Sequence, residues 1–169
     1  MITFHYSKRV YESIWIHIQI NTMELKMFFV ECLYYILYFG IFAQKQIFDI
    51  DINHRPSFIF VILFFISEIN NLHCHIILRS IRLNNKFQRE IPTGNIFNLV
   101  YCANYFWEIC SWLSLSIYSS LKSFYFFTFM GGVIMSMWAL EKKNFYTKML
   151  HKKNLDINKN KMAIIPFIL

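Results

Sequence analysis

Glycine is scarce in this chain, and the glycine-rich loops that bind nucleotides in many soluble enzymes are missing. The 169 residues include four Gly against nineteen Phe, a balance that does not suit a compact soluble α/β fold. No GxGxxG pattern follows an expected strand, so a Rossmann domain is not supported. Gly131 and Gly132 stand together inside an apolar stretch, where we interpret them as a point of close helix packing.

Paired cysteines are missing too. The chain has Cys32, Cys74, Cys102 and Cys110 but no CxxC pair, and we expect buried thiols instead of disulfides or metal ligands. His73-Cys74-His75 is a weak metal motif because side chains at i and i+2 of a helix point apart. We therefore predict no metal site.

What the chain has instead is long apolar sequence. It is 56% hydrophobic and 20% aromatic, with a mean hydropathy of +0.36. Four stretches, at 27–43, 57–78, 99–119 and 123–140, are long enough to span or nearly span a bilayer. The alternating segments of membrane barrels are absent, which leaves helices as the spanning structure. We predict an all-α polytopic membrane bundle of about four transmembrane helices plus short flanking helices.

The charges orient this bundle. Residues 141–161 hold seven Lys against two acidic residues, and residues 79–90 hold four basic residues against Glu90. The positive-inside rule places both segments in the cytosol, with the C-terminus. The same topology explains the positive charge of the tail, so we predict no nucleic-acid partner. We expect residues 1–169 to form one membrane domain whose apolar end, 162–169, packs back against the bundle.

Four polar residues form a stripe along the second stretch. Asn71, His75, Arg79 and Arg82 recur at helical spacing, so they share one face that begins within the membrane and ends among cytosolic basic residues. Guanidinium groups bind phosphates in a bidentate fork, and His and Asn suit sugar or amide groups. A rim of basic residues on lipid headgroups explains the same spacing and stays open.

A second polar group interrupts the third stretch. Asn104, Tyr105, Glu108 and Trp112 are three or four residues apart, on one side of the expected helix. A carboxylate within a membrane indicates a functional site. Tyr is able to donate a proton, and Glu108 is suited to orient an amide or ribose group or to tie two helices together. A structural hydrogen-bond network remains an equal alternative.

These residues also carry a family resemblance. Segments 71–82, 91–97, 103–112 and 163–169 resemble, in order and spacing, the C-terminal domain of the steroid 5α-reductase family. Segment 5–17 and His75 resemble its enoyl-CoA reductase branch. The resemblance covers nearly the whole chain but only about the C-terminal half of such an enzyme, so we expect the isolated chain to lack part of its substrate enclosure.

The resemblance implies an enzyme of the endoplasmic reticulum membrane that uses NADPH to reduce trans-2-enoyl-CoA to acyl-CoA in very-long-chain fatty acid elongation. It implies Tyr105 and Glu108 as catalytic residues, with Tyr105 as the proton donor. The implied cofactor-binding residues are Arg9, Asn71, His75, Arg79, Arg82, Arg89, Asn104, Glu108, Trp112 and Tyr146. Elongase complex members are expected partners. A steroid or polyprenol reductase, or an inactive fragment that serves as a partner, is the alternative.

One departure from the family pattern concerns the tail. Lys142-Lys143-Asn144 stands where the family usually has a His shortly before the tail Tyr. The resemblance therefore leaves open whether the tail clamps the cofactor as it does in the family.

Overall fold

The regular elements of the described chain are helices. The computed structural model describes residues 1–17, 33, 57–84, 90–152 and 161–164. The elements are α1 (Ile2–Tyr11), the π-helix η1 (Glu12–Ile16), α4 (Phe58–Asn84), the 3₁₀ helix η3 (Asn95–Asn98), α5 (Ala103–Ser119) and α6 (Lys122–Lys152). The all-α class predicted from the sequence is confirmed for these residues.

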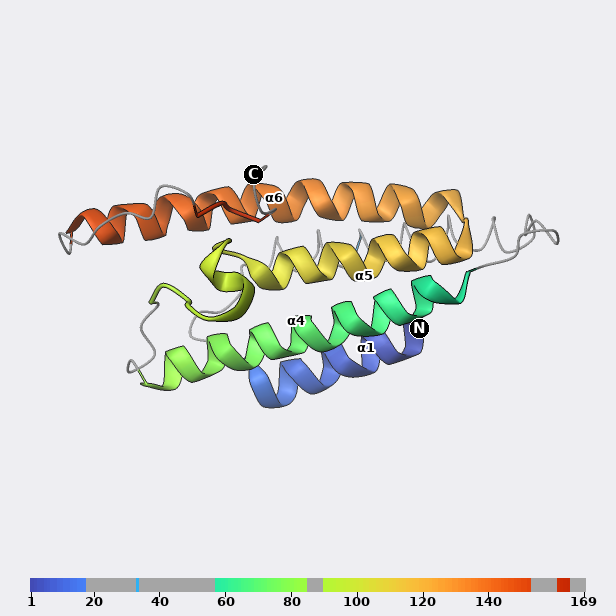
Figure 1. Cartoon of the computed structure of the whole chain (residues 1–169), viewed down its shortest axis with the longest axis horizontal. Coiled ribbons are helices and arrows are strands. Elements are labelled where there is room, and N and C mark those ends of the chain that lie inside the picture. The colour runs from blue at the N-terminus through green and yellow to red at the C-terminus, as the bar shows by residue number, and fades with distance from the viewer. Residues whose placement is uncertain (18–32, 34–56, 85–89, 153–160, 165–169) are drawn as a thin grey trace.

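Four of the helices run along the long axis of the molecule. In Figure 1, α5 lies between α4 and α6, and α1 lies along α4 on the side away from α6. The contacts agree, because α5 packs against both α4 and α6, and η1 packs against α4. This arrangement puts the polar residues of α1, α4 and α5 on neighbouring elements.

Helix α4 has a mixed inner face and an apolar outer face. Phe64, Glu68, Asn71 and Cys74 are buried at helical spacing, whereas large hydrophobic residues such as Phe58, Ile62, Ile69 and Ile76 are exposed. The helix contains neither Gly nor Pro, so nothing interrupts it between Phe58 and Asn84. It therefore continues past the predicted end of this span, at 78, and carries Arg79 and Arg82 on the same rigid rod.

Two described helices, α4 and α6, are long and apolar enough to cross a membrane. This indicates a membrane protein. The expected four-span bundle is not confirmed, because the structure describes only residue 33 of the stretch 27–43 and α5 is not among the two candidate spans. The third expected span begins late, since α5 starts at Ala103 and residues 95–98 form η3.

The turn between α5 and α6 is tight. Ser120 takes a left-handed conformation with φ of 55°, and its amide closes the end of α5 on the Ser116 carbonyl. Helix α6 then runs 31 residues to Lys152, twelve residues beyond the predicted boundary at 140. The extension carries Lys142 and Tyr146 back along α5.

The C-terminal segment returns to the bundle. Met162 forms a parallel bridge with Val100, and the amides of Tyr101 and Cys102 donate to the carbonyls of Met162 and Ala163 at 2.9 and 3.0 Å. Ala163 and Ile164 are fully buried. The predicted return of the apolar end is confirmed for residues 162–164.

The prediction of buried thiols is confirmed for two of the three cysteines that the structure describes. Cys74, Cys102 and Cys110 are free thiols, the first two buried. The glycine pair of the sequence lies in α6, and a Cβ at Gly132 would lie 3.9 Å from Ile109 of α5. Gly132 thus marks a helix contact, as expected.

Candidate functional site

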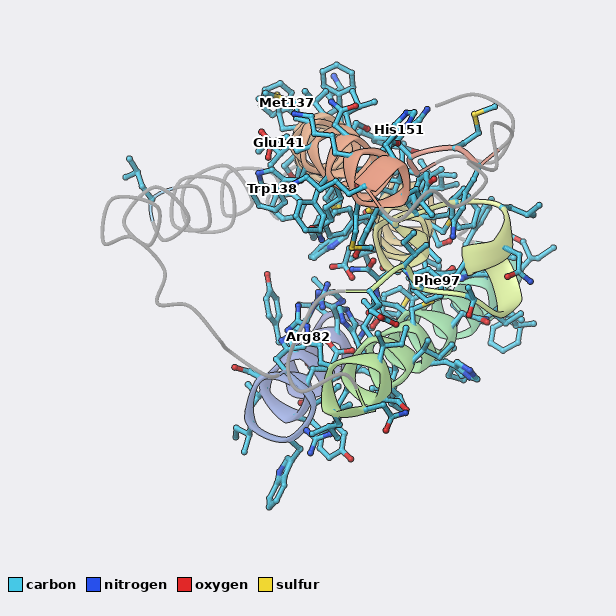
Figure 2. The ribbon with its side chains drawn as sticks, turned by 90° about the vertical axis from the view of Figure 1, so that its left-hand side faces the viewer. Arg82, Phe97, Met137, Trp138, Glu141 and His151 are labelled. Carbon is cyan, nitrogen blue, oxygen red and sulfur yellow. The ribbon has the colours of Figure 1, made fainter. Side chains whose placement is uncertain are left out.

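A cavity of about 830 Å³ opens between α1–η1, α4, α5 and α6. Figure 2 shows Arg82 on the α4 side and Trp138 and Glu141 on the α6 side. Most of the sequence-predicted site residues line it: Arg9, Asn71, His75, Arg79, Arg82, Asn104, Tyr105, Glu108 and Trp112. The two polar stripes found in the sequence therefore face the same space, as does Arg9 from the N-terminal helix.

Tyr146, a further predicted residue, does not belong to this group. Tyr146 lines a smaller cavity of about 80 Å³ with Arg82 and Lys142, and its ring stacks on Tyr101 at a centroid distance of 5.6 Å. Arg89 lies outside the described residues. Among the predicted site residues that the structure describes, Tyr146 thus lies beside the main cavity and does not line it.

Tyr105 is the phenol of the cavity. The ammonium of Lys142 donates a 2.7 Å hydrogen bond to its hydroxyl oxygen and lies 4.3 Å from its ring centroid. The indole of Trp138 lies at 6.3 Å, tilted to the phenol ring. Both neighbours come from α6, four residues apart, so one face of α6 fixes the position of Tyr105.

Arg79 is engaged with the end of η1. Its guanidinium donates to the carbonyl of Trp15 and, at 3.3 Å, to that of Ile16. These carbonyls lie at the C-terminal end of a short helix, where carbonyl groups lack helical partners. Arg79 therefore closes one edge of the cavity, and Arg82 lines it one turn further along α4.

Glu108 joins α5 to the N-terminal helix. Its carboxylate contacts the Arg9 guanidinium, lies 3.6 Å from His5 and accepts a 3.1 Å hydrogen bond from the Trp112 indole. Arg9 also pairs with Glu12 at 2.9 Å. Burial lowers the pKa of Arg9, but the carboxylates of Glu108 and Glu12 outweigh it and raise that pKa above its usual value. Arg9 is therefore a permanent cation at the cavity wall.

A buried charge cluster beneath the cavity was not predicted. Glu68 of α4 pairs with His5 at 2.7 Å and with Lys8 at 2.8 Å. Lys8 also donates to the Asn71 amide oxygen at 2.6 Å, and the Asn71 amide donates to the Asn104 carbonyl at 2.8 Å. Asn71 is thus a link between α1, α4 and α5 as well as a lining residue.

The sequence held signals for this cluster. Glu68 is a carboxylate within a predicted span, and the rule that singled out Glu108 applies to it equally. Lys8 and Glu12 stand at i and i+4, 3.3 Å apart in the structure. The pairing of α1 with α4, 63 residues away in sequence, had no comparable sequence signal.

His73 and His75 of α4 point in different directions, as the helix geometry requires. His73 is exposed on α4, whereas His75 lines the cavity, so the two point apart as predicted. His75 lies 3.3 Å from His17, and burial lowers the pKa of His17 below its usual value, reinforced by Arg9. Glu12, His17 and His75 bring potential metal-ligand atoms within 4.8 Å of one another, but the Arg9 guanidinium touches Glu12 and approaches His75, which disfavours a cation there.

Comparison with known proteins gives this arrangement a family. The family described as 3-oxo-5-alpha-steroid 4-dehydrogenase matches residues 20–169. The chain belongs to this family. This confirms the resemblance seen in the sequence, and the match includes the α4 and α5 residues of the cavity.

Curated relatives of the chain include very-long-chain enoyl-CoA reductases and a 3-oxo-5-alpha-steroid 4-dehydrogenase. The chain is 34% identical, over 99% of its length, to the very-long-chain enoyl-CoA reductase of Dictyostelium discoideum. It is 35% identical over 99% of its length to a probable very-long-chain enoyl-CoA reductase of Caenorhabditis elegans. It is 31% identical over 64% of its length to the human 3-oxo-5-alpha-steroid 4-dehydrogenase 2 and covers 41% of that protein. The chain spans 56% of the length of each of the first two relatives.

Proposed function

We propose that this chain forms the cofactor-binding part of an NADPH-dependent reductase that converts trans-2-enoyl-CoA to saturated acyl-CoA. The observation that supports this most is the single cavity that joins the basic face of α4 to Tyr105 of α5. The reductase relatives support the reaction class and the enoyl-CoA substrate.

The donor groups of the cavity suit a phosphate-rich dinucleotide. Arg9, Arg79, Arg82 and Lys142 line it, whereas the acidic lining residues are Glu108, which is paired with Arg9, and Glu141. Guanidinium groups bind phosphate oxygens strongly and with defined geometry. We assign the phosphates to Arg79 and Arg82, and the sugar or amide groups to Asn71, His75 and Asn104. Arg89, Trp112 and Tyr146 are proposed as further cofactor contacts.

Tyr105 is the proposed general acid. When bound, the reduced nicotinamide supplies a hydride to the β-carbon of the enoyl thioester. The Tyr105 hydroxyl then donates its proton to the α-carbon, which completes the saturated product. Ile109, Phe127, Met135 and Trp138 also line the cavity and give an acyl chain an apolar surface.

Glu108 acts mainly through Arg9. This ion pair fixes the guanidinium at the cavity wall, which holds a positive charge in place before any ligand arrives. Preorganised charges of this kind stabilise bound anions without the cost of reorganisation. This role corresponds to the sequence hypothesis that Glu108 ties two helices together. Orientation of an amide or ribose group of the cofactor by Glu108 stays a proposal.

The proposed setting is the endoplasmic reticulum membrane, with the C-terminus in the cytosol. The exposed apolar faces of α4 and α6 would contact lipid, and the acyl-CoA head would enter from the cytosolic side. Members of a fatty-acid elongation complex are the proposed protein partners.

The decisive experiment is substrate-dependent NADPH oxidation by the full chain in lipid nanodiscs. A trans-2-enoyl-CoA should be reduced, while a 3-oxo-4-ene steroid and a polyprenol should not. Tyr105→Phe should lower turnover by roughly 10²–10⁴-fold without altering NADPH affinity. Tyr118→Phe, on the same helix but outside the cavity lining, is the matched control.

Three outcomes would contradict the proposal. Reduction of the steroid or the polyprenol alone would change the substrate class. Unaltered turnover of Tyr105→Phe would remove Tyr105 as the proton donor. Failure of the chain to bind NADPH would favour a non-catalytic partner of the elongation complex.

A further inference from the structure

Lys142 brings a charged group into direct contact with the Tyr105 hydroxyl. Its ammonium donates a 2.7 Å hydrogen bond to the phenol oxygen and also lies over the ring, 4.3 Å from the centroid. Both residues line the cavity. We infer that Lys142 is a positioning residue for Tyr105. Its ammonium aims the phenol at the substrate and stabilises the phenolate that remains after proton donation. The inference rests on the proposed function.

The direction of the hydrogen bond matters. An ammonium has three donors and no acceptor, and a phenol hydroxyl has one donor and an acceptor oxygen. Because Lys142 donates to Tyr105, it occupies a lone pair of the oxygen and leaves the O–H proton available for a different acceptor. The contact therefore holds the phenol in place without consuming the proton that the reaction needs.

The interaction also strengthens as the reaction proceeds. In the step, the Tyr105 O–H bond breaks, a C–H bond forms at the α-carbon, and the electron pair of the O–H bond stays on the phenol oxygen. The hydrogen bond between an ammonium and a neutral phenol then becomes a bond between opposite charges, which is stronger. An interaction that is stronger in the transition state than in the ground state lowers the barrier. The phenolate afterwards regains a proton from water.

The geometry of α6 separates Lys142 from its basic neighbours. Trp138 and Lys142, four residues apart, both contact Tyr105. Lys143 points elsewhere, because successive residues of a helix project in different directions, and it is not among the residues that line the cavity. Lys143 is therefore a matched control with the same charge, on the same helix, one position away.

The test uses four variants of the full chain in nanodiscs, assayed with trans-2-enoyl-CoA. Lys142→Met removes the charge and the hydrogen bond, Lys142→Gln keeps a donor without the charge, and Lys142→Arg keeps both. We expect Lys142→Met and Lys142→Gln to lower kcat by roughly ten- to a hundredfold. Lys142→Arg should restore much of the loss, and Lys143→Met should behave as the parent.

Two readouts separate this role from a structural one. The dissociation constant for NADPH, measured by direct binding, should stay within about twofold in every variant, because Lys142 contacts the phenol and the phosphates are assigned to Arg79 and Arg82. The solvent deuterium isotope effect on kcat should rise in Lys142→Met, since proton transfer becomes slower relative to the other steps. In the Tyr105→Phe background, Lys142→Met should add little further loss, because the two residues act as a unit.

The outcomes distinguish this inference from the proposed function. If Tyr105→Phe leaves turnover intact, the proton-donor assignment itself fails. If Tyr105→Phe slows turnover and Lys142→Met does not, the inference alone is overturned. A larger dissociation constant for NADPH with an unaltered kcat would also overturn the inference, because Lys142 would then contribute to cofactor binding.

Discussion

The His5 imidazole lies 2.7 Å from the Glu68 carboxylate, and both side chains are almost completely buried. The second oxygen of Glu68 lies 2.8 Å from the Lys8 ammonium. One carboxylate of α4 thus holds two residues of α1, one turn apart. Because α1 also supplies Arg9 to the cavity, this pairing helps to fix the position of the Arg9 guanidinium at the cavity wall.

Removal of Glu68 should loosen the N-terminal helix. Glu68→Ala leaves the buried Lys8 ammonium without its main counter-charge, and such a loss typically costs about 3–5 kcal/mol of unfolding free energy. We expect a clear fall in the apparent Tm of the detergent-solubilised chain, with Glu68→Gln intermediate. Asn70→Ala is the control, since Asn70 lies two residues along α4 and its amide donates to the Ile66 carbonyl of the same helix. Equal behaviour of Glu68→Ala and Asn70→Ala would mean that the cluster adds nothing to stability.

Arg82 should contribute directly to cofactor affinity. It lines the cavity near the C-terminal end of α4, and hydrogen bonds to charged groups contribute about 1.5–3 kcal/mol. Arg82→Ala should therefore raise the dissociation constant for NADPH by roughly ten- to a hundredfold, as measured by equilibrium binding to the full chain. Lys148→Ala, a basic residue of α6 outside the cavity lining, is the control. An unaltered dissociation constant for NADPH together with weaker binding to anionic lipid would favour the alternative interpretation, in which Arg82 belongs to a rim of basic residues on lipid headgroups.

Arg79 should show a mixed effect. Its guanidinium caps the carbonyls at the end of η1, so Arg79→Ala removes both a cavity cation and a helix restraint. We expect weaker NADPH binding and also faster hydrogen exchange at the amides of η1, whereas Arg82→Ala should affect only binding. Unchanged exchange in η1 would show that the carbonyl contacts do not hold that segment.

Much of the site followed from the sequence because its residues sit on long helices. The spacing of Asn71, His75, Arg79 and Arg82 fixes a common face once the segment is a helix, and α4 is one without interruption. The same holds for Tyr105 and Glu108 on α5. Periodicity settles which residues of one helix share a side, and both stripes were correct in this respect.

Helical periodicity does not predict contacts between segments that are distant in sequence. Lys142 stood out only as a departure from the family pattern in a basic tail, yet α6 continues to Lys152 and brings it to Tyr105. His5 and Lys8 belong to a short helix that no hydropathy pattern assigns to α4. Where two helices meet depends on the packing of both, and a single sequence gives no direct measure of it.

Lys161 lies buried beside the returning C-terminal segment. Its ammonium donates to the Pro92 carbonyl at 2.9 Å and lies 4.7 Å from the Tyr101 ring centroid. Burial lowers its pKa to about 8, because the charged form loses its hydration. This residue lies outside the two candidate membrane helices, so it reports on the attachment of the tail.

The lowered pKa sets the sign of a pH effect. Between about pH 8 and the usual lysine value near 10.4, the unfolded chain binds more protons at this position than the folded chain. Stability contributed by Lys161 therefore rises with pH across this window. We expect the apparent Tm of the parent chain, relative to that of Lys161→Met, to increase from pH 7.5 to pH 10, with Lys148→Met as the exposed-lysine control. A difference that stays constant with pH would mean that Lys161 titrates alike in both states, and the tail would then not bury its ammonium.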